Sequence, residues 1–311
     1  MMNVLSVNAP AHIQDLGRYG LRRYGIGHAG AMDTLSLRAG NILLGNEENA
    51  PALEIALGGI SVSFERDTPF CITGALYHAE LDGEPVHSYW RYTARKGQVL
   101  KLVRAVQGMY GYLCVAGGFD VPEVLGSKST DLKAGFGGHE GRMLEKGDEI
   151  PLGGGAEHLG RVGIAHIPFT NCIHLFPSSE YGAFTEQSHI HLFHKPWLLQ
   201  SDSNRMGYRF DGHGHNLELK QPLEMLSHAV QAGTVQVPPG GNPIILLADA
   251  QTTGGYPKIA CVAAADLGRL AQVRFGGKIR FKQIDGAKAA KLLRQNEVYL
   301  NQVRKIANEN S

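Results

Sequence analysis

Residues 53–75 read LEIALGGISVSFERDTPFCITGA, a Leu-Glu-apolar start followed by a glycine, an apolar run, a turn with a proline and a second apolar run. Short apolar and β-branched runs between glycine or proline turns are typical of β-strands. Residues 223–250, LEMLSHAVQAGTVQVPPGGNPIILLADA, follow the same order. We interpret the two stretches as a degenerate internal repeat, with chance similarity as the alternative. The repeat predicts two related β-domains with a ligand cleft between them.

The same pattern predicts strands along most of the chain. Several runs are almost continuously apolar, as expected for strands buried on both faces of a closed barrel. The predicted strands cover residues 53–55, 60–64, 70–73, 99–103, 110–116, 190–193, 234–237, 244–247, 258–264 and 278–283. The fold class is therefore mainly β, and we place the two β-domains at residues 1–155 and 156–285.

Few helices are predicted. One begins after Asp33, a favourable N-cap, and ends at Gly45, and a short one follows Ser178. The third is an amphipathic C-terminal helix over residues 286–311, which Asp285 can cap. Its basic face is interpreted as a solvated surface. Its predicted apolar positions are Ala290, Leu293, Tyr299, Val303 and Ile306.

Composition excludes several classes of function. The chain has 311 residues, 43% hydrophobic and 19% charged, with a net charge of +1. Such a balance gives no broad attraction to nucleic acid or to anionic membranes. No apolar run approaches the roughly 20 residues of a membrane span. The four cysteines lie far apart, as for reduced thiols, and the N-terminal residues show no basic leader, so we expect a cytoplasmic protein.

Three short motifs do not carry a cofactor or metal. GIGHAG at residues 25–30 matches the dinucleotide pattern G-x-G-x-x-G, but it follows the charged LRRY and not an apolar strand. GSKS at residues 126–129 lacks the spacing of a phosphate-binding loop. His189, His191 and His194 fall on a predicted strand without a nearby acid, so no metal site is expected. The chain also lacks a Met-Lys-Met carrier turn, so it carries no biotin of its own.

A glycine-rich polar loop at residues 117–148 is the strongest functional signal. It reads GGFDVPEVLGSKSTDLKAGFGGHEGRMLEKGD. Glycines there allow positive φ or a close approach to a ligand, and long ordered polar loops usually carry function. Three further polar segments accompany it: residues 14–33, 202–209 and 249–258. For each acid and arginine in these segments, the alternative is a buried pair that fixes a loop.

These segments carry a resemblance to a known family. GGFDVPEVLGSKSTDLKAGFGGHEGR, SNRMGYR and QTTGGYPK, with QDLGRYG and GAMD near the start, resemble the biotin-dependent carboxyltransferase / allophanate hydrolase subunit 2 family, closest to those members that form the C subunit of 5-oxoprolinase. The resemblance covers roughly residues 3–285, and its motifs are long and ordered. It implies a fold of two cyclophilin-like β-barrel domains, which agrees with the strand pattern.

The resemblance also implies a function. Such a chain would be one subunit of an ATP-dependent 5-oxoprolinase that hydrolyses the lactam of 5-oxo-L-proline to L-glutamate. Since the chain shows no recognisable nucleotide-binding loop, we expect it to be inactive alone. Its partners would be subunits A and B, the latter resembling a kinase inhibitor, and ATP would be used by the complex. One alternative is a carboxyltransferase subunit of a biotin-dependent urea or allophanate system. Another is a non-catalytic binding partner of a kinase-inhibitor-like protein.

Lactam opening with ATP requires cations for phosphate and carboxylate, polar groups for the amide, and a group that moves protons. We therefore expect Asp131, Asp249 and Lys258 to act in catalysis. Arginines and side-chain amides or hydroxyls are expected to bind the substrate. The predicted substrate-binding residues are Gln14, Arg18, Ser127, Ser129, Asn204, Arg205, Arg209, Gln251, Thr253 and Tyr256.

Overall fold

The computed structural model describes residues 1–156 and 158–310. Two compact units make up the chain, and each is described here by itself. The first contains Met1–Arg18, Ala29–Pro168 and Asn296–Ser311, and the second contains Tyr19–His28 and Phe169–Gln295. The predicted domain boundaries at residues 1–155, 156–285 and 286–311 stay a prediction.

The first unit is built on a nine-stranded antiparallel sheet. Its path runs β2-β3-β8-β4-β1-β9, and β5 pairs with β6, β7 and β8. The strands are β1 (Met2–Val7), β2 (Ala11–Gln14), β3 (Ala52–Ala56), β4 (Ile60–Phe64), β5 (Thr68–Leu81), β6 (Glu84–Val86), β7 (Arg91–Ala94), β8 (Val99–Val115) and β9 (Glu149–Ile150). One face buries a core of aliphatic and aromatic side chains, which include Ile13, Leu53, Val62, Phe70 and Leu113.

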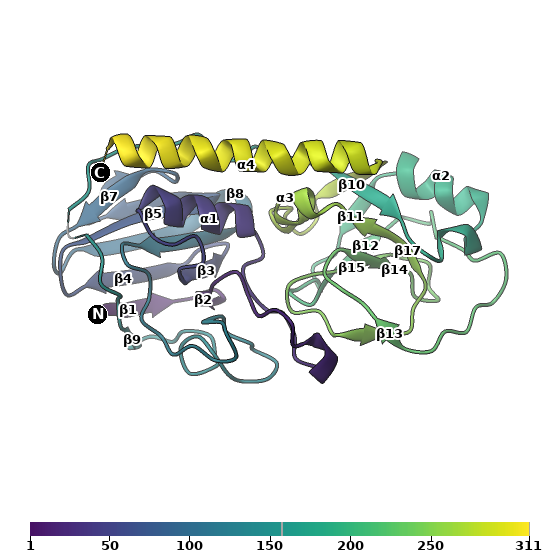
Figure 1. Ribbon diagram of the computed structural model, residues 1–311, viewed down its shortest axis with the longest axis horizontal. Helices are drawn as coiled ribbons and strands as arrows, with labels where there is room; N and C mark the ends of the chain where they lie inside the picture. Colours follow the sequence, from purple (N-terminus) through teal and green to yellow (C-terminus); the bar gives the residue numbers. More distant parts are fainter. Residues whose placement is uncertain (157, 311) are drawn as a thin grey trace. The chain divides into compact units, whose positions relative to one another are not determined.

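Helix α1 (Thr34–Leu43) packs against β5 and β8 of this sheet (Figure 1). The predicted cap is confirmed, because the Asp33 carboxylate accepts a hydrogen bond from the Ser36 backbone at 3.1 Å. The helix ends at Leu44, and Gly45 follows with a positive φ of 71°. The helix therefore begins after Asp33 and ends before Gly45, as expected from the sequence.

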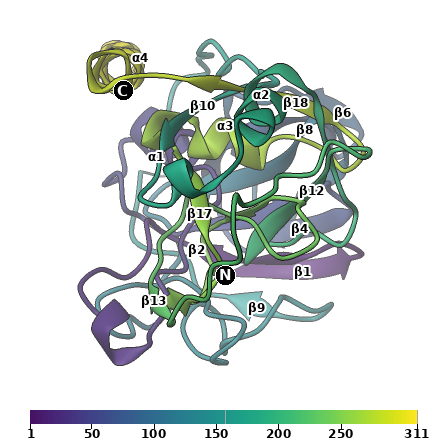
Figure 2. The same ribbon diagram turned by 90° about the vertical axis from the view of Figure 1, so that its right-hand side faces the viewer.

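The second unit contains a closed barrel with the strand order β10-β17-β14-β15-β12-β11-β18. Strands β10 and β18 close it in parallel, and the other barrel pairs are antiparallel. Two of its strands, β10 and β17, can be followed in Figure 2. The strands are β10 (Cys172–Pro177), β11 (Trp197–Leu199), β12 (Gly207–Asp211), β14 (Thr234–Gln236), β15 (Ile244–Leu246), β17 (Lys258–Val262) and β18 (Lys278–Gln283).

Short elements complete the second unit. A two-stranded sheet pairs β13 (His228–Ala229) with β16 (Thr253–Gly254). The helices are α2 (Glu186–His194) and α3 (Leu267–Ala271), and the 3-10 turns are η1 (Arg22–Tyr24), η2 (Tyr181–Ala183) and η3 (Ala264–Asp266). The mainly β fold is confirmed, with a closed barrel in one unit, a half-barrel sheet in the other and few helices.

The C-terminal helix α4 (Gly286–Glu309) is confirmed, and the Asp285 carboxylate caps it by accepting from the Lys288 backbone at 2.8 Å. Its buried positions are Leu292, Leu300, Val303 and Ala307. The prediction that Leu293 lies on the apolar face of the helix is wrong, because this residue is 47% exposed. The prediction of a fully solvated basic face needs one correction, since Arg304 is half-buried and pairs with Glu48.

Three strand predictions are also corrected. Residues 190–193 belong to helix α2 and not to a strand. The helix is capped by Thr185, whose side-chain hydroxyl accepts a hydrogen bond from the Ser188 backbone at 3.1 Å. The predicted strands 99–103 and 110–116 are two ends of the single strand β8. The two repeat segments share a strand order but not a pairing: β4 pairs with β1 and β8, whereas β14 pairs with β15 and β17.

No helix within the described residues is long and apolar enough to cross a membrane.

Candidate functional site

Several glycines of the 117–148 loop bring this loop close to its own chain. All of those singled out from the sequence have positive φ: Gly117, Gly118, Gly126, Gly135, Gly137, Gly138 and Gly141. A Cβ at Gly137 would overlap the Ser129 carbonyl and the Arg18 guanidinium, and one at Gly138 would overlap the Thr130 hydroxyl. The close approach predicted for a ligand is therefore made here to protein atoms.

Asp15 is the centre of a buried group that we call the Asp15 cluster: Asp15, Arg18, Ser127 and Ser129. Asp15 is 2% exposed. Its Oδ1 accepts from the Gly17 backbone at 2.7 Å and from the Ser127 and Ser129 hydroxyls at 2.7 and 2.5 Å. Its Oδ2 accepts from the Lys128 backbone at 2.6 Å. These donors join β2 and its following turn to the glycine-rich loop.

Arg18 completes the Asp15 cluster from the other side of the loop. The residue is 1% exposed, and its Nε donates to the Val124 carbonyl at 3.1 Å. Its Nη2 donates to the Ser129 carbonyl, and the guanidinium lies 4.6 Å from the centre of the Phe136 ring. Backbone carbonyls and an aromatic face thus hold this cation in the interior.

Gln14 and Asp131 also serve this loop. Gln14 is fully buried, and its Nε2 donates to the Thr130 carbonyl at 3.0 Å. The Asp131 Oδ1 accepts from the backbones of Lys133 and Ala134 at 3.1 and 3.0 Å, which is the geometry of an Asx turn. The structure thus brings the predicted residues of the first unit together, but around backbone groups. This favours the loop-fixing alternative for all of them.

A second buried polar group in the first unit escaped the sequence analysis. Glu54 Oε2 accepts from the Met32 backbone and from the Tyr112 hydroxyl, both at 2.8 Å, and that hydroxyl accepts from the Asp33 backbone at 2.7 Å. Burial, together with the charges of Glu54 and Asp33, raises the pKa of Tyr112 well above its ordinary value. The contacts fix Met32 and Asp33 just before α1. Glu54 lies in the Leu-Glu-apolar start of the first repeat segment, which is the one signal that pointed to it.

In the second unit, Arg205 and Asp249 form a two-pronged ion pair. Arg205 Nε and Nη2 lie 2.8 Å from Asp249 Oδ2 and Oδ1, and the side chains are 9% and 13% exposed. Asn204, the preceding residue, accepts from the Met206 backbone at 2.9 Å and is exposed. The pair ties the turn before β12 to the segment 249–258.

Lys258 lies at the start of β17 between an acid and a histidine. Its Nζ is 2.9 Å from Glu180 Oε2 and contacts His228 Nε2. Burial disfavours the Glu180 carboxylate, but hydrogen bonds from Ser179 and Lys258 outweigh it and lower the pKa of Glu180 below its ordinary value. Neither Glu180 nor His228 was predicted, because both lie far from Lys258 in sequence and carry no motif.

The remaining predicted residues of this segment lie around β13 and β16. The Gln251 carbonyl accepts from Arg22 Nη2 at 3.1 Å, and Arg22 also donates to the Val230 carbonyl. Burial lowers the pKa of Arg22. Thr253 pairs with Ala229 across the two strands. Thr253 and Tyr256 are exposed, whereas Asp249 and Lys258 on either side of them are half-buried.

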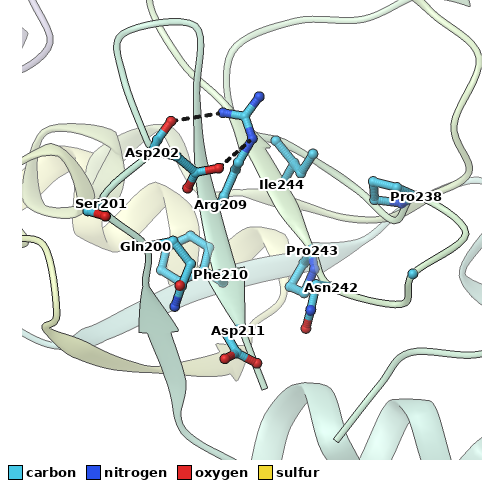
Figure 3. Close-up of a pocket in the computed structure, with 11 residues that line it drawn as sticks. Gln200, Ser201, Asp202, Arg209, Phe210, Asp211, Pro238, Asn242, Pro243 and Ile244 are labelled. Carbon is cyan, nitrogen blue, oxygen red and sulfur yellow. Dashed lines mark hydrogen bonds and ion pairs between the residues drawn. The ribbon is translucent and has the colours of Figure 1, made fainter. Parts of the chain in front are cut away.

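Arg209 differs from the other predicted cations because it lines a pocket. The pocket has a volume of about 470 Å³ and lies within the second unit, around β12. Figure 3 shows the guanidinium beside Asp202 at one end, Asp211 at the other, and Gln200, Asn242 and Ile244 along the walls. Of the predicted site residues, only Arg209 lines this pocket.

The three histidines of H-x-H-x-x-H lie on helix α2 and not on a strand. His189 stacks on Tyr181 at 3.8 Å between ring centres, and His191 contacts the Asn216 carbonyl at 3.1 Å. Among the residues that the structure describes, no three histidine, cysteine or acidic side chains gather as metal ligands.

Comparisons with known proteins agree on one family. The model of the carboxyltransferase domain, subdomain A and B, matches residues 24–283. The chain is 59% identical over 309 residues to the C subunit of 5-oxoprolinase from Haemophilus influenzae, covering 99% of each chain. It is 45% identical to the Escherichia coli protein of the same name, with both chains fully covered. Among solved structures, the urea amidolyase of K. lactis superposes with a TM-score of 0.89 at 26% identity, covering 97% of this chain and 20% of that one.

Proposed function

The chain belongs to the carboxyltransferase domain family, subdomains A and B, and on this premise we propose that it is one subunit of an ATP-dependent 5-oxoprolinase. The enzyme would hydrolyse the lactam of 5-oxo-L-proline to L-glutamate. One observation carries the proposal: the chain is similar over its whole length to two proteins named as the C subunit of 5-oxoprolinase, at 59% and 45% identity. Full coverage of both chains supports the same role in a complex.

The word subunit in those names implies further chains, and we propose subunits A and B as the partners. We also propose that this chain is inactive alone. Supporting this, the groups expected to move protons are engaged within the chain: Asp131 in its own turn, Asp249 with Arg205, and Lys258 with Glu180. A complete site for lactam hydrolysis would then need groups from another chain of the complex.

Three of the four predicted cations do not fit a nucleotide as they stand. Arg18 is held by carbonyls, whereas Arg205 and Lys258 are paired with carboxylates. The first turn of α1, where a phosphate could otherwise bind, is capped by the Asp33 carboxylate. We therefore propose that ATP is bound by another chain of the complex.

A carboxyltransferase role in a urea system is the second candidate, and one observation favours it: the superposition on the K. lactis urea amidolyase. That protein is about five times longer than the region it shares with this chain, since the match covers 20% of it. The greater identity and full coverage of the 5-oxoprolinase relatives make the first function the better supported one.

The cysteines support a cytoplasmic location, which we also propose. Cys71 and Cys114 are buried directly opposite each other on β5 and β8, and both are free thiols. Buried cysteines without disulfides are typical of proteins from a reducing compartment.

Gene replacement tests the proposed function. In a host that uses 5-oxo-L-proline as nitrogen source, the gene for the host's own C subunit is deleted and this chain is expressed instead. We expect growth on 5-oxo-L-proline to return and intracellular 5-oxo-L-proline to fall. Stable expression of the chain without either change would overturn the proposal.

A further inference from the structure

We propose that the pocket beside Arg209 is the binding site for the lactam substrate. This inference rests on the proposed function, which supplies the identity of the ligand, and on the chemistry of the pocket, which no relative's name assigns. 5-Oxo-L-proline presents four features: a carboxylate, an amide carbonyl, an amide N–H and two ring methylene groups. The pocket offers a counterpart to each.

The strand β12 places charged groups on the outer side of the barrel. Phe210 is 1% exposed and therefore points into the barrel, so Arg209 and Asp211 point outward. They are about 6.6 Å apart along the strand, at two residues of about 3.3 Å each. Ile244 pairs with Arg209 in register on β15 and supplies an apolar wall next to the guanidinium.

The Arg209 guanidinium is available to a ligand. Within the described residues, its polar contacts are with Asp202: Nη1 donates to the Asp202 carbonyl at 3.3 Å, and Nε lies 3.5 Å from Oδ2. The Asp202 side chain is 68% exposed, and such solvated pairs contribute little. A ligand carboxylate can therefore replace this contact and accept two hydrogen bonds from the planar guanidinium.

The amide side chains of the pocket complement a lactam. Asn242 Oδ1 accepts from the Gly212 backbone at 3.2 Å, which leaves its Nδ2 group to donate to the lactam carbonyl. Gln200 Nε2 donates to the Leu198 carbonyl at 3.2 Å, which leaves its Oε1 to accept the lactam N–H. Pro243 and Ile244 lie along the same wall and can pack against the ring methylenes.

The pocket matches the closed ring better than the open product. Ring opening turns the lactam amide into a second carboxylate and an ammonium group, so L-glutamate keeps the net charge of the substrate but loses the rigid ring. The flexible product must be ordered on binding and no longer offers a ring to Pro243 and Ile244. Opening the lactam would thus weaken binding and promote product release.

Ligand titrations of the isolated full chain, followed by NMR, test this site. We expect saturable binding of 5-oxo-L-proline, with L-proline, pyrrolidin-2-one and L-glutamate each binding about tenfold more weakly or worse, because each loses a polar contact or, for L-glutamate, the rigid ring. Equal binding of pyrrolidin-2-one, which lacks the carboxylate, would remove Arg209 from the site.

Two variants locate the binding. Arg209→Met should weaken 5-oxo-L-proline binding at least about tenfold. Asn242→Asp keeps the acceptor for Gly212 but removes the donor to the lactam carbonyl, and should weaken binding similarly. Arg95→Met, at an exposed arginine of the first unit, is the matched control and should bind as the unchanged chain does.

Different results would disprove the proposed function and the proposed binding pocket. If the complex with subunits A and B releases glutamate but both variants bind and turn over normally, the pocket inference is wrong and the function stands. If the assembled complex releases no glutamate, the proposed function is wrong, and the pocket loses the substrate assigned to it. Weakened binding in both variants, with the control unchanged, supports the pocket.

Discussion

The Asp15 cluster of the first unit and the Arg209 pocket of the second contain the same kinds of residue, but their polar atoms have different partners. In the Asp15 cluster, one carboxylate receives four hydrogen bonds from its own chain and the arginine is held by carbonyls. In the pocket, the arginine has one weak, solvated partner. The difference separates residues that build the loop from residues that can meet a ligand.

Burial decides which role a polar residue takes here. A buried carboxylate must have its hydrogen bonds made within the protein, so Asp15 is engaged before any ligand arrives. An exposed guanidinium can exchange water for a ligand at little cost. Four substitutions test this contrast, from the largest expected effect on stability to the smallest.

Asp15→Ala should cause the largest loss. The substitution leaves the donors of Gly17, Ser127, Lys128 and Ser129 without their acceptor in the interior, at about 1 kcal/mol each. We expect the free energy of unfolding of the first unit to fall by about 3–4 kcal/mol, measured by urea denaturation. Asp202→Ala is the control, with a change within about 0.5 kcal/mol. Similar losses in both variants would contradict the claim that the Asp15 cluster stabilises the fold more than the polar residues of the pocket do.

Arg205→Met should have the next largest effect, about 2–3 kcal/mol, because it leaves Asp249 in the interior without its cation. The double variant Arg205→Met with Asp249→Leu should lose less than the single one, since it removes the unpaired charge as well. Denaturation of the four members of this cycle measures the coupling. Simple addition of the two single effects would show that the pair does not act as a unit.

Glu180 should make the stability of the second unit depend on pH in the acidic range. Its pKa is lowered on folding, so its contribution to stability is present above the ordinary value of 4.5 and is lost as the pH falls through the folded pKa. Lys258→Met removes the partner, so stability should fall less steeply as the pH drops below 4.5 than in the unchanged chain. Parallel pH profiles for the two chains would rule out this pairing as the cause.

Arg209→Met should have the smallest effect on folding, within about 0.5 kcal/mol, because the Arg209–Asp202 contact is long and exposed. Thermal unfolding followed by circular dichroism checks this value. A loss of about 2 kcal/mol or more would place Arg209 with the Asp15 cluster, as a residue that holds the fold.

The fold was largely predictable where local pattern and burial agree. The strand predictions for residues 60–64 and 278–283 coincide with β4 and β18, and the caps Asp33 and Asp285 are as predicted. Residues 190–193 failed because an apolar run this short suits a helix as well as a strand, and the Thr185 cap decides for the helix. The pairing of the strands was beyond the sequence, since the two repeat segments share an order but join different neighbours.

The site was less predictable, for a physical reason. The sequence shows which residues can ionise, but not which contacts they make across long separations. Asp15 and Ser129 are 114 residues apart, and Lys258 and Glu180 are 78 apart. Residue types therefore pointed to segments rich in polar groups, whereas only the contacts show that Asp15 and Arg18 are engaged and that Arg209 faces a pocket.

Glutamate release from 5-oxo-L-proline tests the central claim most directly. The chain, subunits A and B and ATP are combined, and each component is omitted in turn. We expect glutamate only from the complete mixture, and no inhibition by avidin if the reaction proceeds without biotin. A verified complex that releases no glutamate, or equal release without this chain, would contradict the claim.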